Sequence, residues 1–155
     1  RQQNTILRRR DLTGFTAVTS PQGRAVETAN IALASCGTTI RQDALLAEIG
    51  VGAWEGMYRA DLPVTDGTID SEDGALDLYE KAPDGEGFEA LYRRCNVFLT
   101  RLDRPAVLVT HGITSRILRV ILLGRKISDI DTVDGGQGVV FFLNGVVQTK
   151  LSIGA

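Results

Sequence analysis

The sequence of 155 residues has few cysteines and histidines, and no long apolar run. Cys36 and Cys95 are isolated, with no CxxC pair and no histidine nearby, which argues against a zinc site and a disulfide framework and favours a reducing, cytoplasmic compartment. A membrane-spanning helix needs about 20 apolar residues, and no stretch reaches that length. We therefore expect no metal, no cofactor and no membrane association.

Charge of one sign is also lacking, because 17 basic residues nearly balance 19 acidic ones and the net charge is −2. Such a chain has no broad field to attract nucleic acid, so its arginines must act locally. Hydrophobic residues make up 43% and charged residues 23%, which is ordinary for a globular protein. The length predicts a single domain over residues 1–155.

Strands and helices are predicted to alternate, which favours an α/β fold: a three-layer α/β/α sandwich with a mostly parallel sheet and an antiparallel edge strand. The Asn-Gly pair at 144–145 predicts a hairpin turn. The irregular stretch 61–87 is predicted to hold one helical turn at 76–79. The expected elements are helix 1–10, strand 15–19, helix 20–37, strand 38–40, helix 88–102, strand 105–111, helix 113–124 and hairpin 139–153.

Two strand-to-helix junctions carry residues suited to holding an anion. His111, the only histidine, ends an apolar strand and is followed by Gly112 and a helix, and Ser20 precedes a helix whose first turn contains Arg24. Helix N-termini attract phosphate through their free N–H groups, and parallel strands end at one edge of a sheet. Arg24 opposes the local dipole, so either an anion or a surface carboxylate such as Glu27 is expected beside it.

A third segment, EIGVGAWEG at 48–56, contains a carboxylate between apolar residues. Burial of Glu48 would raise its pKa and suit it to donate a proton, whereas an exposed carboxylate on an irregular strand is the simpler interpretation. The glycines of this segment do not have the spacing of a dinucleotide-binding loop.

Together these segments resemble the histidine phosphatase superfamily, the phosphoglycerate mutase-like proteins. The matching stretches occur in the family's order: SPQGRAVETA at 20–29, EIGVGAWEG at 48–56, Gly85-Glu86, VTHG at 109–112 and Leu123-Gly124. The resemblance implies that Arg24 clamps phosphate, that Glu48 is the general acid and that His111 contacts the transferring phosphoryl group. Ser20, Gly112 and Glu86 are expected to contact substrate, although Gly87 replaces the family's serine after that glutamate.

One feature of the family is missing. Its first strand ends in Arg-His-Gly, whose histidine receives the phosphoryl group, and this sequence has no second histidine. Residues 1–3 resemble the segment that follows this motif inside the first helix. We therefore expect residues before Arg1 that supply a central strand and the start of the first helix; the alternative is a degenerate protein without its nucleophile.

The resemblance implies a metal-independent phosphomonoester hydrolase that acts on a phosphorylated small molecule through a phosphohistidine. Mutase-type (isomerase) transfer is an alternative, less favoured because the stretch between Glu55 and Glu86 is short for the mutase insertions. The other alternative is a non-catalytic phosphate-binding module. The apolar final strand, 146–153, leaves open a homodimer formed by edge pairing.

Overall fold

Strands and helices alternate along the chain in the computed structural model, which describes residues 2–58, 61–62 and 74–153. The first half contains α1 (Gln2–Leu7), β1 (Thr16–Thr19), α2 (Gly23–Leu33), β2 (Ile40–Gln42) and the 3₁₀ turns η1 (Ala44–Leu46) and η2 (Gly52–Trp54). The second half contains α3 (Gly74–Lys81), α4 (Gly87–Thr100), β3 (Ala106–Val109), α5 (Gly112–Leu122), η4 (Ile127–Thr132), β4 (Val140–Asn144) and β5 (Val147–Leu151). This order confirms the predicted α/β class.

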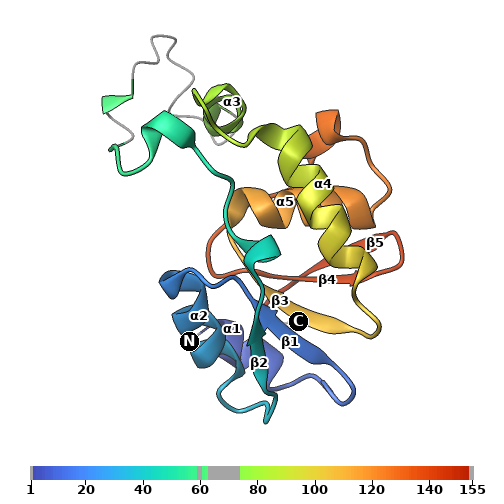
Figure 1. Ribbon diagram of the computed structural model, residues 1–155. Coiled ribbons are helices and arrows are strands. Elements are labelled where there is room, and N and C mark those ends of the chain that lie inside the picture. The colour runs from blue at the N-terminus through green and yellow to red at the C-terminus, as the bar shows by residue number, and fades with distance from the viewer. Residues whose placement is uncertain (1, 59–60, 63–73, 154–155) are drawn as a thin grey trace.

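A parallel sheet of three strands, in the order β2-β1-β3, positions the functional segments (Figure 1). Ala17 of β1 pairs with Ile40 on one side and Val107 on the other. Thr19 pairs with Val109 at the end of both strands, so Ser20 and His111 leave the sheet at the same edge. This edge is formed by the carboxyl ends of the strands, where open α/β sheets bind ligands.

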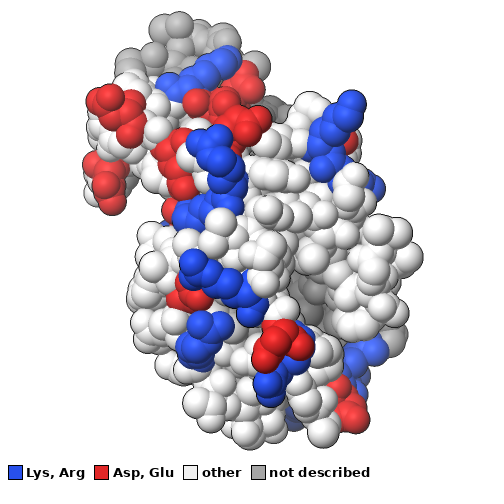
Figure 2. Space-filling model, turned by 45° about the vertical axis from the view of Figure 1, so that its right-hand side comes forward, with Lys and Arg blue, Asp and Glu red and all other residues white. Residues whose placement is uncertain are grey.

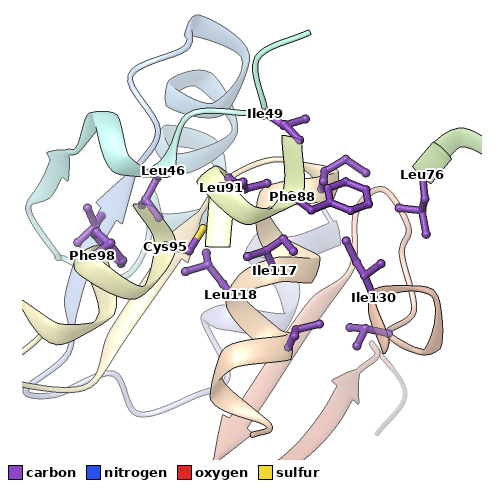
Figure 3. Packing of buried hydrophobic residues seen from close by; sticks show 14 residues of the cluster. Leu46, Ile49, Leu76, Phe88, Leu91, Cys95, Phe98, Ile117, Leu118 and Ile130 are labelled. Carbon is purple, nitrogen blue, oxygen red and sulfur yellow. The ribbon is translucent and has the colours of Figure 1, made fainter. Parts of the chain in front are cut away.

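Helices cover both faces of this sheet. Neighbouring residues of β1 point to opposite faces, so each packs against a different layer of helices. Ala17 packs with Leu7 of α1 and Leu33 of α2, whereas Val18 belongs to the larger core beneath α4 and α5. In Figure 3, Leu91 and Cys95 of α4 lie close to Ile117 and Leu118 of α5. The result is the predicted three-layer arrangement.

The hairpin predicted at 139–153 is present as β4 and β5, which pair in antiparallel register with Asn144 opposite Val147. It forms a sheet of its own rather than an edge of the parallel one. Within the described ranges, the outer edge of β3 has no strand partner, and all four residues of β3 are partly exposed. The prediction of antiparallel strands is therefore confirmed, but in the described residues these strands are not attached to the parallel sheet.

A buried arginine connects this hairpin to α5. The Arg119 guanidinium lies over the Phe141 ring at 3.9 Å from its centroid and donates to Gln148 Oε1 at 3.1 Å. Burial, together with nearby Arg116, lowers the pKa of Arg119 to about 10, so the guanidinium is still charged at neutral pH.

Several element boundaries differ from the sequence prediction, and the helix predicted at 20–37 spans only Gly23–Leu33. β2 begins at Ile40 rather than 38, after Gly37 has turned the chain at a φ of +62°. α3 spans Gly74–Lys81 rather than one turn, because it buries Leu76 and Leu78. α1 ends at Leu7 rather than 10. Residues 63–73 of the predicted irregular stretch lie outside the described residues.

Candidate active site

The two strand-to-helix junctions meet through their side chains. Arg24, in the first turn of α2, donates from Nε to His111 Nδ1 at 3.2 Å. His111 Nε2 lies 2.8 Å from the hydroxyl of Ser20, which is fully buried. Arg24 forms no ion pair with Glu27 or any other acidic residue in the part of the chain that the structure describes. The guanidinium is thus directed toward the imidazole and not toward a surface carboxylate.

These contacts define the state of the imidazole. Because Arg24 donates to Nδ1, that nitrogen must be unprotonated, so Nε2 carries the hydrogen and donates it to Ser20. Burial lowers the pKa of His111 below its ordinary 6.5, and Arg24 lowers it further, while Glu48 acts in the opposite direction. His111 is therefore neutral at neutral pH, with both ring nitrogens engaged.

Glu48 lies against the N-terminus of α5. Its Oε1 accepts from the N–H of Thr114 at 3.0 Å and lies 3.0 Å from the Thr114 hydroxyl oxygen, and its Oε2 accepts from the N–H of Ile113 at 3.2 Å. The carboxylate thereby takes the place of an N-cap side chain, since His111 provides no such bond. Glu48 is half-buried, which differs from the simpler interpretation of an exposed carboxylate.

The two helix N-termini at this edge consequently have different roles. Glu48 already compensates the dipole of α5, whose first turn was expected to hold phosphate together with that of α2. Gln22, the N-cap of α2, makes no side-chain capping bond, and the first turn of α2 has no acidic residue. The α2 end, beside Arg24, is therefore the helix N-terminus at this edge whose dipole is not compensated by a carboxylate.

A peptide group next to Glu48 is held from both sides. The Ala47 carbonyl accepts from Arg94 at 3.0 Å and from the Thr114 hydroxyl at 2.8 Å. The N–H of Glu48 donates to Gln22 Oε1 at 3.0 Å. Fixing both ends of this peptide sets the direction in which the Glu48 side chain leaves the backbone.

Glu86 forms a two-pronged ion pair with Arg94 of α4. Both distances, Nε to Oε1 and Nη2 to Oε2, are 2.8 Å, and Oε2 also accepts from the N–H of Gly50 at 3.2 Å. The Arg94 guanidinium lowers the pKa of Glu86, outweighing the opposing effect of burial, which is the larger single contribution. The structure thus joins Glu86 to Arg94 and does not bring it to Arg24 or His111; its contact with substrate stays a prediction.

Gly112 is exposed at the first position of α5. A Cβ built there would lie 3.8 Å from Glu48 Oε2, an ordinary contact, so the structure imposes no steric need for glycine. Its expected role in substrate contact therefore also stays a prediction.

Sequence reasoning missed three polar residues that organise the site: Gln22, Arg94 and Thr114. Each acts across a long separation in the chain, on Glu48 or the peptide before it. The only sequence signal for Thr114 was its position one helical turn after His111. Gln22 and Arg94 had none.

Other kinds of site are not evident among the described residues. They contain no group of three or more acidic, histidine or cysteine side chains able to hold a metal ion, and no helix long and apolar enough to cross a membrane. On the face in Figure 2, basic and acidic side chains are interspersed. A polar cavity of about 550 Å³ lies in the α1–β1 and α2–β2 connections, away from Arg24, Glu48 and His111.

Solved structures of known phosphatases and of a mutase share this fold. An alpha-ribazole phosphatase from Shigella flexneri superposes with a TM-score of 0.69 at 23% identity, over 97% of this chain and 79% of the other. A mycobacterial glucosyl-3-phosphoglycerate phosphatase in complex with inorganic phosphate gives 0.67 at 24% identity, over 90% and 74%. A phosphoglycerate mutase from Bacillus anthracis gives 0.65 at 20% identity, over 98% and 76%.

A family comparison agrees with these structures and with the motifs. No curated protein matches the chain. The family model "Histidine phosphatase superfamily (branch 1)" matches residues 2–143, which include Ser20, Arg24, Glu48 and His111. The chain belongs to the histidine phosphatase superfamily, branch 1.

Proposed function

We propose that this protein is a metal-independent phosphomonoester hydrolase that acts on a small phosphorylated molecule. The observation that carries the proposal is the meeting of Arg24, Glu48 and His111 at one edge of the parallel sheet, in a member of this superfamily. Arg24 and the N-terminus of α2 bind the phosphoryl oxygens. Neutral His111 orients the Arg24 guanidinium and lies beside the transferred group.

The proposed reaction has two steps. A histidine nitrogen attacks phosphorus, the bond to the ester oxygen breaks, and Glu48 gives its proton to the departing alcohol. Water then attacks phosphorus of the phosphohistidine, the phosphorus–nitrogen bond breaks, Glu48 takes a proton from that water, and inorganic phosphate leaves. The work of the protein is alignment and neutralisation of charge on the phosphoryl oxygens.

His111 is not the attacking residue in this proposal. Its Nδ1 accepts from Arg24, and its Nε2 is bonded to the buried Ser20 hydroxyl. The attacking histidine of the proposed reaction is therefore not one of the residues in this sequence.

The test is hydrolysis of a panel of phosphomonoesters by the full-length protein in the presence of EDTA. Arg24→Ala is expected to lower kcat/KM about 10²–10³-fold, the usual cost of removing one charge-stabilising donor. Arg93→Ala, an exposed arginine on α4, is the matched control and is expected to leave activity unchanged. Activity of Arg24→Ala within tenfold of the unmodified protein would refute the assignment.

A non-catalytic phosphate-binding module is the second candidate, because the only histidine in the sequence has both ring nitrogens engaged. Intact mass of the natural protein separates the two. A mass near 16.7 kDa favours the binding module, and a mass several kilodaltons larger favours the enzyme. Assays with 3-phosphoglycerate, with and without 2,3-bisphosphoglycerate, separate a phosphatase from a mutase.

A further inference from the structure

Gln22 is the one side chain of the described residues that hydrogen-bonds to both Arg24 and Glu48. Its Oε1 accepts from the N–H of Glu48 at 3.0 Å and from Nη2 of Arg24 at 3.5 Å. Both partners are donors, so the amide can have only this orientation, with oxygen toward them. The contact joins the phosphate-binding arginine to the backbone of the residue proposed as the acid.

The backbone of Gln22 is itself tied to the imidazole side of the site. Its N–H donates to the Ser20 hydroxyl at 3.2 Å, and the same hydroxyl accepts from His111. Gln22 is the N-cap of α2 in an extended conformation, so its side chain leaves the helix end rather than lying along the helix. It is therefore anchored before its amide reaches Glu48.

Arg24 needs the contact with the Gln22 amide because it is an exposed residue with a long, flexible side chain. His111 holds Nε of the guanidinium at 3.2 Å, and Gln22 makes a weaker contact with Nη2 at 3.5 Å. Two contacts set the plane of the group and leave Nη1 free of protein partners in the described part of the chain. A guanidinium held in this way loses little further freedom when it binds an anion.

Glu48 needs the contact for a different reason. Arg94 and Thr114 hold the carbonyl of the Ala47–Glu48 peptide, and Gln22 alone holds its N–H. Without that acceptor the peptide can tilt, which moves the Glu48 carboxyl relative to the leaving oxygen. A misplacement of about 1 Å in a proton donor costs roughly 10²-fold in rate at most.

From this geometry we infer that Gln22 is a positioning residue that fixes Arg24 and Glu48 relative to each other. The inference rests on the proposed function, because it assigns Gln22 to proton donation by Glu48 and to phosphate binding by Arg24. It predicts that replacing Gln22 lowers kcat most for substrates whose leaving oxygen needs a proton. Alkyl phosphates need that proton, whereas p-nitrophenyl phosphate has a good leaving group and needs it little.

The experiment compares kcat for an alkyl phosphate and for p-nitrophenyl phosphate in the full-length protein. Gln22→Met, which keeps the length and removes the acceptor, is expected to lower the alkyl-to-aryl ratio of kcat about tenfold. Gln22→Asn, which remains polar but cannot reach Glu48, is expected to do the same. Gln42→Met is the matched control, because Gln42 is exposed on β2, and its ratio stays unchanged.

Glu48→Gln separates failure of the inference from failure of the proposed function. If Glu48→Gln lowers the ratio and both Gln22 variants leave it unchanged, the role of Gln22 is overturned and the acid survives. If Glu48→Gln also leaves the ratio unchanged, the acid assignment itself is overturned. In the supported case, Gln22→Met added to Glu48→Gln lowers the ratio no further, because both act on one step.

Discussion

Arg94 of α4 holds the segment that carries Glu48, so replacing it with methionine is a strong test of the structure. Its guanidinium makes two bonds to Glu86 and donates to the carbonyls of Leu45 at 2.7 Å and Ala47 at 3.0 Å. Arg94→Met keeps the aliphatic packing and removes all four bonds. It also leaves Glu86 without its charge partner.

The expected loss can be estimated from these contacts. Breaking a buried ion pair costs about 3–5 kcal/mol. The Arg94 and Glu86 side chains are 18% and 21% exposed, so water replaces part of the interaction and the estimate moves to the lower end. The two carbonyls add about 1 kcal/mol together after the same discount. We expect the free energy of unfolding to fall by about 4 kcal/mol, and Tm by about 8–16 °C.

Urea denaturation followed by far-UV circular dichroism measures this change. Arg93→Met, on the exposed side of the same helix, is the control and is expected to cost less than about 0.5 kcal/mol. Adding Glu86→Gln to Arg94→Met removes the stranded charge and is expected to restore about 1 kcal/mol. A loss below about 1 kcal/mol in Arg94→Met, or no recovery in the double variant, would refute the reasoning.

Three further predictions concern the site and its loops. The pKa of His111 is lowered on folding, so its contribution to stability is complete above the ordinary value of 6.5 and is lost as the pH falls below that value. Between pH 7.5 and 5.5, the free energy of unfolding should therefore fall less in His111→Gln than in the unmodified protein. Ser20→Ala removes the acceptor of a buried imidazole N–H and should cost about 1–3 kcal/mol in urea denaturation, with a value below 0.5 contradicting that bond. Gly52→Ala should cost about 2–4 kcal/mol, because its Cβ would clash with the Pro83 carbonyl oxygen at a φ of +50°. Gly14→Ala, also at positive φ but in open space, should cost about 1 kcal/mol by the same measurement, and equal losses would contradict the close approach.

Local patterns predicted the elements and brought Arg24 and His111 to one edge. His111 lies two residues after β3, and Arg24 lies in the first turn of the helix that follows β1. Parallel strands end together, so their proximity follows from the topology. The hairpin was equally accessible, because its turn has a two-residue signature.

The surroundings of Glu48 could not be predicted in this way. Its carboxylate reaches the start of α5, far along the chain, and no periodicity encodes which helix end it contacts. The same holds for Gln22 and Arg94, whose partners are backbone groups of the segment around residue 48. Backbone groups are identical in every sequence, so only the folded path shows which of them a side chain meets.

The separation of β4 and β5 from the parallel sheet has a consequence for local opening. An isolated pair of strands is marginally stable in water, so this hairpin depends on its attachments. The described polar attachments are Arg119 over Phe141, its bond to Gln148, a weak bond from Gln3 to the Val139 carbonyl at 3.5 Å, and a bond from Arg9 to the Ile153 carbonyl at 2.9 Å just beyond β5. Amide hydrogens of residues 140–151 should therefore exchange with solvent before those of the parallel strands, and the hairpin can detach and return while the edge bearing Arg24 and His111 keeps its form.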